Sequence, residues 1–476
     1  MNGLSQVAVL LAGLLLAPVA SGADWPQFRG PDSLGIAAAD ARPPLAFGTA
    51  SNLTWQVTVP PGNSSPVIRD GRLFLTGFHE GQLLTLAFDS ATGRERWRRS
   101  LPPSRVEDVH RSLGSPASAT PTTDAHRVYV HFGSFGLAAY DFDGTEKWRQ
   151  PLPVTETEYG ASSSPVLAGN RVIQLLDQDG HSYLVAVEAD TGKIAWRVER
   201  PEMRRGFGTP ILWEHHGRTD LVVPGTIFMA GLNPVSGEER WRVSGLARIT
   251  CTTPVVAGNS LFAASWTTGG DRSNDRIELP NFAEVLAAND QDQDGRLSHA
   301  ELPKGAAQER KKHLDGNRDG FVDRNEWESM AAIFAKVENQ AWRLEASDTG
   351  TVTDAGVKWR FKRGLPYVAS PLFHDGWVYL VKNGGLLTCL NATDGTPAYQ
   401  EQRLPAPGDY YASPVVADGH LYVASQPGVI SVVKAGPRFE LVSRNDLGES
   451  VQASPAVVGN HLYLRTASHL YAFTRP

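Results

Sequence analysis

Hydrophobic and polar positions alternate along most of the chain, in short segments separated by turn residues. Around Pro66 the pattern reads NSSPVIRDGRLFL: a small residue, Ser or Thr, Pro, an apolar strand, a turn and a second strand. Such alternation places one face of each strand inward, which is typical of half-buried β-strands. The segment recurs at eight prolines: Pro66, Pro121, Pro165, Pro210, Pro254, Pro371, Pro414 and Pro455. The intervals between them are 55, 44, 45, 44, 117, 43 and 41 residues.

A second segment follows most copies. It contains an alternating strand, an Asp or Asn, a turn with Gly and a strand with Trp, as in LAFDSATGRERWR around Trp97. The turn glycines permit the positive φ of tight hairpins. Each repeat therefore predicts four short antiparallel strands, and a repeat of about 44 residues is typical of a propeller blade. The recurrent Trp supplies large apolar area where neighbouring blades pack.

The two ends of the chain are complementary. The last repeat ends without a Trp strand, whereas an unpaired strand, LTWQVTV, contains Trp55, 42 residues before Trp97. We expect this strand to complete the eighth blade and close the ring, which removes an open sheet edge. The predicted fold class is all-β: an eight-bladed β-propeller with a small α-helical insertion. The expected divisions are 24–52 as an N-terminal extension, 53–270 and 341–476 as the propeller, and 271–340 as the insertion.

The long interval contains a charged segment with two matches to D-x-[DN]-x-[DN]-G-x5-E, at Asp290–Glu301 and Asp315–Glu326. Calcium takes six to eight oxygen ligands, and this spacing supplies them from one loop. The sequence predicts two calcium ions. The predicted ligands are Asp290, Asp292, Asp294, the Arg296 carbonyl, Ser298 and Glu301, then Asp315, Asn317, Asp319, the Phe321 carbonyl, Asp323 and Glu326.

Apolar residues at helical spacing flank both loops, and the segment resembles an EF-hand pair. Leu297 and Val322, at the eighth position of each loop, are expected to pair in a short ribbon. The alternative is an acidic, solvated insertion that binds no metal. Bound calcium is expected to act structurally, because extracellular sites of this type bind at about 0.1–1 mM.

The N-terminal residues predict export. An apolar run from Leu4 to Val19 is followed by small residues up to Ala23, which is typical of a signal peptide spanning residues 1–23. The alternative is an N-terminal anchor helix. No other stretch approaches the roughly 20 apolar residues of a membrane helix, so we expect a periplasmic or secreted protein without a membrane segment in the mature chain. Such a location permits a disulfide between Cys251 and Cys389, although the sequence leaves their bonding open.

Charge is concentrated in the insertion. The whole chain has 45 basic and 51 acidic residues, a net charge of −6. Residues 271–340 hold 10 and 15 of these, which gives −5, so the rest of the chain carries −1. A nearly neutral propeller argues against nucleic-acid binding.

The rhythm A-x-D-x-x-T-G-x-x-x-W, as in VAVEADTGKIAWR around Trp196, resembles the repeat of pyrroloquinoline quinone (PQQ) enzymes and their non-enzymatic relatives. Those relatives include a propeller of the outer-membrane β-barrel assembly machinery. The resemblance covers roughly residues 50 to 476 apart from the insertion. It implies the propeller fold and leaves activity open. PQQ dehydrogenases typically carry two adjacent cysteines, which this sequence lacks, so PQQ is not expected as a cofactor.

The expected function is a binding or assembly scaffold, without catalysis, that holds a protein, peptide or glycan at the propeller rim. No catalytic residue is assigned. A PQQ-dependent oxidoreductase and a calcium-dependent saccharide binder are the alternatives. The segment Ser104–Ser118 is predicted to form a loop over one mouth, with Arg105, His110 and Arg111 as contacts. Arg204 and Arg205 are candidates for the same rim, although solvated rim loops are the favoured interpretation of all these residues.

Overall fold

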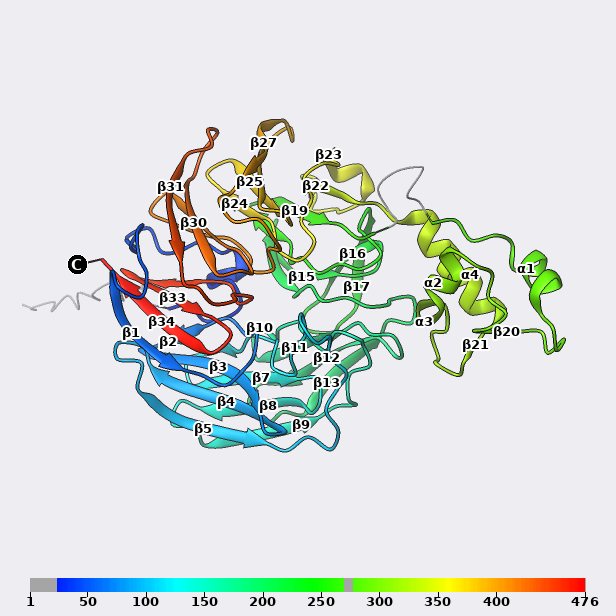
Figure 1. Ribbon diagram of the computed structural model, residues 1–476, viewed down its shortest axis with the longest axis horizontal. Coiled ribbons are helices and arrows are strands. Elements are labelled where there is room, and N and C mark those ends of the chain that lie inside the picture. The colour runs from blue at the N-terminus through cyan, green and yellow to red at the C-terminus, as the bar shows by residue number, and fades with distance from the viewer. Residues whose placement is uncertain (1–23, 269–276, 476) are drawn as a thin grey trace, which may run out of the picture.

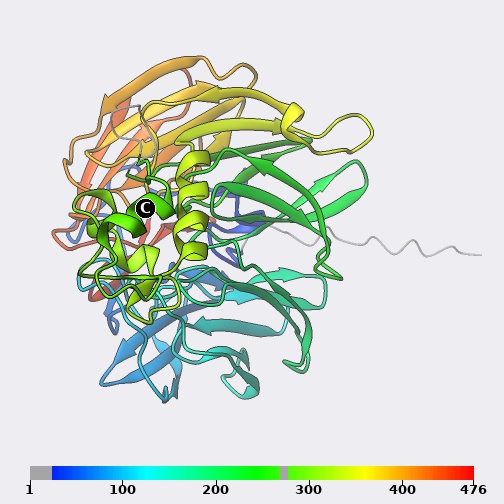
Figure 2. The ribbon, with the colours of Figure 1, turned by 90° about the vertical axis from the view of Figure 1, so that its right-hand side faces the viewer.

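The structure is a computed structural model that describes residues 24–268 and 277–475 (Figure 1). Within these residues the strands form eight four-stranded sheets with antiparallel neighbours. Figure 2 shows the sheets as a ring, with the insertion in front of it. The chain is therefore an eight-bladed β-propeller, which confirms the fold class predicted from the repeats. The predicted signal peptide lies outside the described residues.

Blades 1 to 4 each use four consecutive strands, and the first strands of adjoining blades contact one another around the axis. Blades 1 and 2 contain β2 (Val67–Arg69), β3 (Arg72–His79), β4 (Gln82–Asp89), β5 (Glu95–Leu101), β6 (Thr122–Thr123), β7 (Arg127–Phe132), β8 (Gly136–Asp141) and β9 (Glu146–Pro151). Blades 3 and 4 contain β10 (Val166–Ala168), β11 (Arg171–Leu176), β12 (Tyr183–Glu188), β13 (Ile194–Glu199), β14 (Ile211–His215), β15 (Arg218–Pro224), β16 (Phe228–Leu232) and β17 (Glu239–Ser244).

Blades 5 to 8 follow the same plan with two exceptions: blade 5 contains the insertion and blade 8 uses both ends of the chain. Blades 5 and 6 contain β18 (Val255–Ala257), β19 (Ser260–Ser265), β22 (Gln340–Glu345), β23 (Val357–Phe361), β24 (Leu372–His374), β25 (Trp377–Lys382), β26 (Leu386–Asn391) and β27 (Pro397–Arg403). Blades 7 and 8 contain β28 (Val415–Ala417), β29 (His420–Ala424), β30 (Val429–Lys434), β31 (Leu441–Asp446), β32 (Ala456–Val458), β33 (His461–Arg465), β34 (His469–Thr474) and β1 (Leu53–Thr58). Two 3-10 turns, η1 (Pro31–Ser33) and η2 (Asp354–Gly356), lie outside the blades.

The N-terminal strand closes the ring. Strand β1 pairs antiparallel with β34, and Trp55 lies opposite Ala472. This pairing supplies the Trp strand that the last repeat lacks, which confirms the predicted closure. As a result the eighth blade joins residues that are more than four hundred positions apart in the chain.

The Ser or Thr before each repeated proline forms a closed ring of hydrogen bonds at the axis. In every blade its backbone N–H donates to the hydroxyl of the corresponding residue in the next blade, at 2.9–3.0 Å. The proline that follows holds this residue in an extended conformation. In order around the axis the eight residues are Ser65, Thr120, Ser164, Thr209, Thr253, Ser370, Ser413 and Ser454. All of them are buried.

The repeated tryptophans pack between blades, as predicted. The Trp55 indole lies against Gly93 of blade 1, where an added Cβ would come within 2.6 Å of the ring. Its N–H donates to the Ser90 carbonyl at 3.1 Å. The same pair of contacts joins the Trp97, Trp148, Trp196 and Trp359 indoles to turns of the next blade, at Gly144, Gly192, Gly237 and Gly395. The glycine of the repeat is therefore required both by the turn and by the neighbouring indole.

The N-terminal segment, residues 24–52, contacts several blades. Trp25 bridges to Ile68 of blade 1, and Thr123 of blade 2 donates to the Pro26 carbonyl. The buried Arg29 guanidinium donates to the Pro371 carbonyl at 2.7 Å, at the start of blade 6. Further along, Ala37 and Phe47 bond to blade 7. The sequence gives no indication of this path, because the segment has no repeat pattern.

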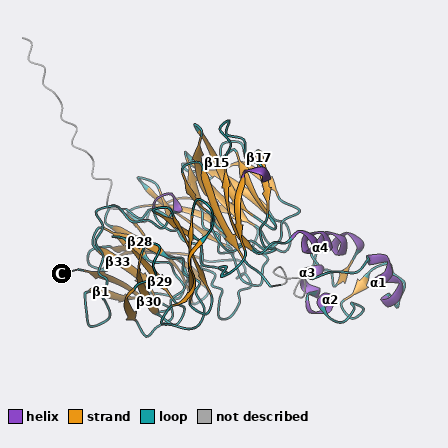
Figure 3. Cartoon of the chain, turned by 90° about the horizontal axis from the view of Figure 1, so that it is seen from above, coloured by secondary structure: helices purple, strands orange, loops and turns teal. Residues whose placement is uncertain are grey.

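The insertion leaves the ring between β19 and β22. It contains α1 (Phe282–Asn289), β20 (Leu297–Ser298), α2 (Ala306–Glu309), α3 (Lys311–Leu314), β21 (Phe321–Val322) and α4 (Arg324–Lys336). Figure 3 shows that most of the helical structure lies here, beside the strands of the ring. Its apolar residues form a separate cluster that includes Trp327 and Phe334 and extends to Ile227 of blade 4. No helix in the described part of the chain combines the length and apolarity needed to cross a bilayer.

The loop between β5 and β6 is held down by a buried carboxyl group. Glu107 is 3% exposed, and its side chain lies against Gly133 and Ala161. Ala161 N–H donates to it at 3.4 Å, while burial raises the pKa of Glu107 to about 8. The residues named for this loop, Arg105, His110 and Arg111, are all exposed, as the solvated interpretation expects. Glu107, which the sequence did not single out, anchors the loop.

We predict that Ser413→Ala lowers the stability of the ring. The substitution leaves the buried Ser370 N–H without its acceptor, which costs about 1–3 kcal/mol. Chemical unfolding measures the loss. Ser100→Ala, at an exposed position of β5, is the control and should change the free energy of unfolding by less than about 0.5 kcal/mol. Equal effects for the two variants would contradict the role of the hydroxyl ring.

We predict that Glu107→Gln flattens the pH dependence of stability. The folded carboxyl keeps its proton up to about pH 8, whereas the unfolded chain releases it near pH 4.5. The wild type should therefore lose about 1.4 kcal/mol per pH unit between these values as pH rises. Urea unfolding from pH 5 to 8 measures this slope. Glu214→Gln, at an exposed position, should retain the slope, and an unchanged slope in Glu107→Gln would contradict the prediction.

Candidate functional site

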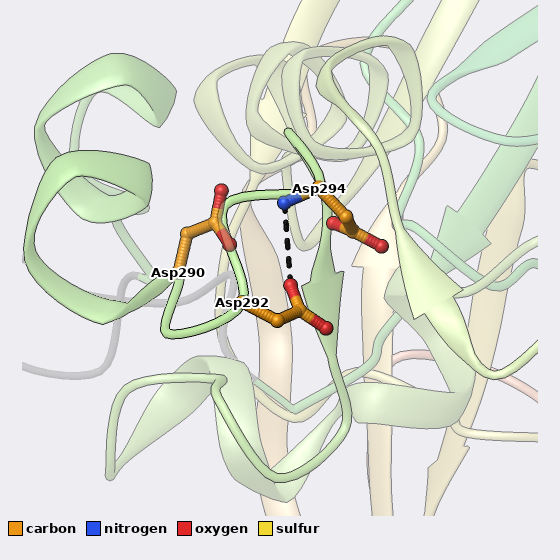
Figure 4. Close-up of side chains that lie close together, drawn as sticks. All are labelled: Asp290, Asp292 and Asp294. Atoms are coloured by element: carbon orange, nitrogen blue, oxygen red, sulfur yellow. Dashed lines mark hydrogen bonds between the residues drawn. The ribbon is translucent and has the colours of Figure 1, made fainter.

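The first acidic loop of the insertion brings three carboxylates together. Oxygens of Asp290, Asp292 and Asp294 lie within 4.8 Å of one another (Figure 4). The loop is held by backbone donors: Asp294 N–H donates to Asp292 at 3.2 Å and Gly295 N–H to Asp290 at 3.1 Å. Gly295 has φ 82°, a conformation that side chains disfavour. The turn therefore directs several oxygens toward one point.

Glu301 closes this loop. Its carboxylate accepts hydrogen bonds from the backbone of Gln291 at 2.9 Å and of Ser298 at 2.8 Å, and from the Ser298 hydroxyl at 2.7 Å. These bonds, led by the one from Gln291, lower the pKa of Glu301. The Asp290 Oδ1 atom is buried and has no hydrogen-bond partner among the described residues. A buried, unpartnered carboxylate oxygen of this kind is suited to bind a cation.

The second loop repeats the scheme. Asp319 N–H donates to Asn317 at 2.9 Å, Gly320 N–H to Asp315 at 3.1 Å, and Gly320 has φ 90°. Glu326 accepts from the backbone of Gly316 at 2.9 Å, as Glu301 does from Gln291. Burial raises the pKa of Glu326, so the two closing glutamates differ in environment.

The remaining predicted ligands lie where the two loops meet. Leu297 pairs with Val322 and Ser298 with Phe321, which confirms the predicted ribbon. The Arg296 guanidinium lies over the Phe321 ring, 4.0 Å from its centre. Asp323 begins α4 with a capping box that involves Glu326. Among the described residues, the structure brings three predicted carboxylates of the first loop, Asp290, Asp292 and Asp294, within 4.8 Å of one another, and the second loop forms no such group.

Two ion pairs that were not predicted join the loops, and in one of them Arg296 lies 3.5 Å from Asp319. His299 Nε2 lies 2.8 Å from Asp315 Oδ2, and Asp315 is 4% exposed. The first loop thus provides a partner for the first residue of the second. The helices that flank the loops match the predicted apolar spacing, with Phe282 and Val285 buried in α1 and Trp327 and Met330 buried in α4.

A cavity of about 320 Å³ lies at the axis of the ring, next to the insertion. The eight hydroxyl residues of the ring form part of its wall. Phe28 of the N-terminal segment, Leu113 of the Glu107 loop and His313 of α3 contribute to the same wall. Further aromatic residues of the wall are Tyr159, Phe207, Tyr367 and Tyr411, and its charged residues include Glu158, Arg205 and Arg248. The cavity is therefore built from the ring, the N-terminal segment and the insertion together.

Ion pairs attach the insertion to the ring beside this cavity. Asp179 of blade 3 binds Arg205, and Arg318 of the insertion lies 3.0 Å from the same carboxylate. Arg205 also lies 3.0 Å from Glu158, which Lys312 of α3 approaches at 3.5 Å. Arg205 lines the cavity, as Leu113 of the Glu107 loop does, so the structure places it where the sequence suggested. It is 3% exposed and acts in this buried network, so the solvated interpretation is wrong for Arg205.

Arg248 and His313, two residues of the cavity wall, form no ion pair with a carboxylate among the described residues. Arg248 is 7% exposed, and no carboxylate among the described residues forms an ion pair with it. Burial is the main cause that lowers the pKa of Arg248 to about 10, and the positive charge of nearby Arg205 adds to it. Arg248 therefore stays protonated at neutral pH. The buried Nδ1 of His313 has no hydrogen-bond partner within the described ranges. Burial, with Arg205 and Arg248, lowers the pKa of His313 to about 4.

The two cysteines are both free. Cys251 lines the cavity, whereas Cys389 is buried within blade 6, and burial raises the pKa of each thiol to about 12. The disulfide left open by the sequence is therefore absent from this structure. A single thiol at the cavity also differs from the pair of adjacent cysteines typical of PQQ dehydrogenases.

Sequence reasoning missed Arg248, His313 and Asp179. The repeat could have indicated that Arg248 lies near the axis, because this residue stands six positions before the repeated Pro254, in a loop that leads to the axis. No local motif marks His313, whose position depends on how the insertion packs against blade 4. These residues become a site only when the ring is closed.

The chain is similar to known proteins in sequence and in fold. A family model described as "Outer membrane protein assembly factor BamB" matches residues 46–179, 80–269 and 281–435. A search of curated proteins finds no match. Among solved structures, BamB from Moraxella catarrhalis is similar at 12% identity and TM-score 0.54, over 88% of this chain and 98% of that one.

Quinohemoprotein alcohol dehydrogenase from Comamonas testosteroni is similar at 14% identity and TM-score 0.55, over 96% of this chain and 81% of that one. At such identities the two structures support the propeller fold and leave activity undecided. The family model spans well over half of the residues. The chain therefore belongs to the family of PQQ-like repeat propellers that the BamB model describes.

Proposed function

We propose that this protein is an exported, calcium-binding propeller that serves as a binding or assembly scaffold for a protein partner and catalyses no reaction. The proposal rests chiefly on the insertion, in which two loops repeat one arrangement of carboxylates and backbone donors. The BamB description of the family model supports a scaffold in the periplasm or at the outer membrane. The apolar N-terminal run supports export.

The calcium sites follow from the donor sets. In the first loop Asp290, Asp292, Asp294 and Glu301 supply carboxylate oxygens, and Arg296 adds a backbone carbonyl. Hard oxygen donors at this spacing suit calcium, and bound calcium would neutralise carboxylates that otherwise repel one another. The buried, unpartnered Asp290 Oδ1 fits the same interpretation.

A structural role suits these sites. The insertion is joined to blade 5 at the last ladder pair of β19 and β22, Ser265 with Gln340. Its own apolar cluster and the ion pairs of Arg318 and Lys312 hold it against the ring. We therefore expect calcium to order the insertion and to leave the blades as they are.

The charge of the cavity wall argues against PQQ as a ligand. PQQ is a tricarboxylate, whereas Arg248 is the one guanidinium of the cavity wall that lacks a carboxylate partner among the described residues. A single positive charge does not balance three carboxylates. Together with the single Cys251 thiol, this imbalance supports a protein that uses no PQQ.

We predict that Glu301→Gln removes one of two calcium sites. The amide lacks one of the carboxylate oxygens that would bind calcium bidentately, so affinity at that loop should fall by at least ~10-fold. Calorimetric titration with calcium should show two sites in the wild type and one in the variant. Glu284→Gln, at an exposed position of α1 outside the loop, is the matched control. No heat in the wild type would contradict the calcium sites.

We predict that a protein partner contacts the mouth beside the cavity. A photo-crosslinking residue at exposed Arg105, on the Glu107 loop, should form a specific adduct in intact cells, identified by mass spectrometry. The control position is Val235, which is 60% exposed in the turn between β16 and β17. The same adduct at both positions would contradict a partner at this mouth.

The non-catalytic part of the proposal has its own test. Purified protein is incubated with PQQ and calcium, and dye-linked alcohol oxidation is then measured. We expect no activity above a sample without PQQ. Oxidation that depends on PQQ would identify the protein as a quinoprotein oxidoreductase instead.

A further inference from the structure

Arg248 occupies an unusual position for a charged side chain. It lies between β17 and β18, on a loop that leads to the axis, and 93% of it is buried, since its exposure is 7%. The Phe334 ring of α4 lies 5.8 Å from its guanidinium carbon. Its Nε atom is buried without a hydrogen-bond partner in the parts of the chain that the structure describes. The guanidinium borders the axial cavity.

The neighbouring charges do not neutralise Arg248. Asp179 and Glu158, the nearby carboxylates, are engaged by Arg205, with Arg318 and Lys312 as further cations. Arg205 itself repels Arg248 and lowers its pKa. Burying a charge without a partner costs several kcal/mol. The fold therefore keeps an uncompensated positive charge at the wall of a cavity, which is the expected form of an anion site.

The other residues of the cavity wall restrict which anions could bind there. Hydroxyl groups of the axial ring, with Asn63 and Gln452, offer hydrogen bonds to a polar molecule. Tyr159, Phe207 and Tyr367 present aromatic surface. A volume of about 320 Å³ is at the small end of ligand pockets, which span roughly 300–1,000 Å³. The cavity thus suits a small organic molecule with one charged end.

We propose that the axial cavity binds a small organic monocarboxylate, whose carboxylate group pairs with the Arg248 guanidinium. The planar fork of arginine donates two parallel hydrogen bonds to a carboxylate, and one free guanidinium balances one negative charge. Because His313 and Phe28 belong to the same wall, the ligand would contact the insertion and the N-terminal segment as well as the ring. This site is separate from the proposed scaffold function and calcium loops.

Binding is tested with benzoate, 4-hydroxybenzoate and glucuronate, each paired with its neutral amide, by isothermal titration calorimetry. At least one of the three acids should bind the wild type at least tenfold more tightly than its amide. Arg248→Gln should abolish that preference, whereas Arg360→Met, at an exposed position of β23, should retain it. Absence of binding by all three acids would overturn the proposal. Inorganic phosphate that binds as tightly as the best acid would overturn the assignment to carboxylates.

A second measurement separates a ligand site from a structural one. Without ligand, Arg248→Met should keep or raise the thermal midpoint of unfolding, because it removes an unpaired buried charge. Arg205→Met removes two ion pairs and should lower the midpoint. A fall of several degrees in Arg248→Met would show a structural role and overturn the proposal. Calcium binding should be unchanged in Arg248→Met, so failure here leaves the calcium proposal intact.

Discussion

The hydrogen bond from one backbone N–H to the hydroxyl of the next blade is the interaction on which this structure depends. It recurs at eight Ser or Thr residues and returns from Ser454 to Ser65, so each blade is fixed relative to both neighbours. At five of the eight blade junctions the outer part of the blade is fixed by an indole that rests on a turn glycine, as Trp55 does on Gly93. The eighth blade is completed by β1, which pairs with β34 far away in the chain.

A ring fixed in this way tolerates additions at the loops. The insertion begins and ends at the pair Ser265 and Gln340, so the β19–β22 ladder keeps its register and the blade is unchanged. The loops before each first strand, by contrast, converge at the axis. That convergence places Arg248, Glu158 and the hydroxyl ring around one cavity, with His313 of the insertion at its wall. The fold thus provides two separate places for chemistry: acidic loops outside the ring and a cavity within it.

The repeats predicted much of this architecture. Local signals were sufficient for the strands, the packing of Trp97 between blades, the closure by Trp55 and the pairing of Leu297 with Val322, because each depends on a short pattern. The path of residues 24–52, the burial of Glu107 and the unpaired Arg248 were not predictable. Each depends on contacts with blades that are distant in sequence, as when Arg29 bonds to the Pro371 carbonyl.

The central claim is that a rigid ring carries an insertion ordered by calcium. Hydrogen–deuterium exchange of the purified protein, with calcium and with a chelator, tests it most directly. We expect calcium to slow exchange in residues 282–337, with no change in β-strands of the eight blades. Exchange that is unaffected in the insertion, or that changes throughout the blades, would contradict the account.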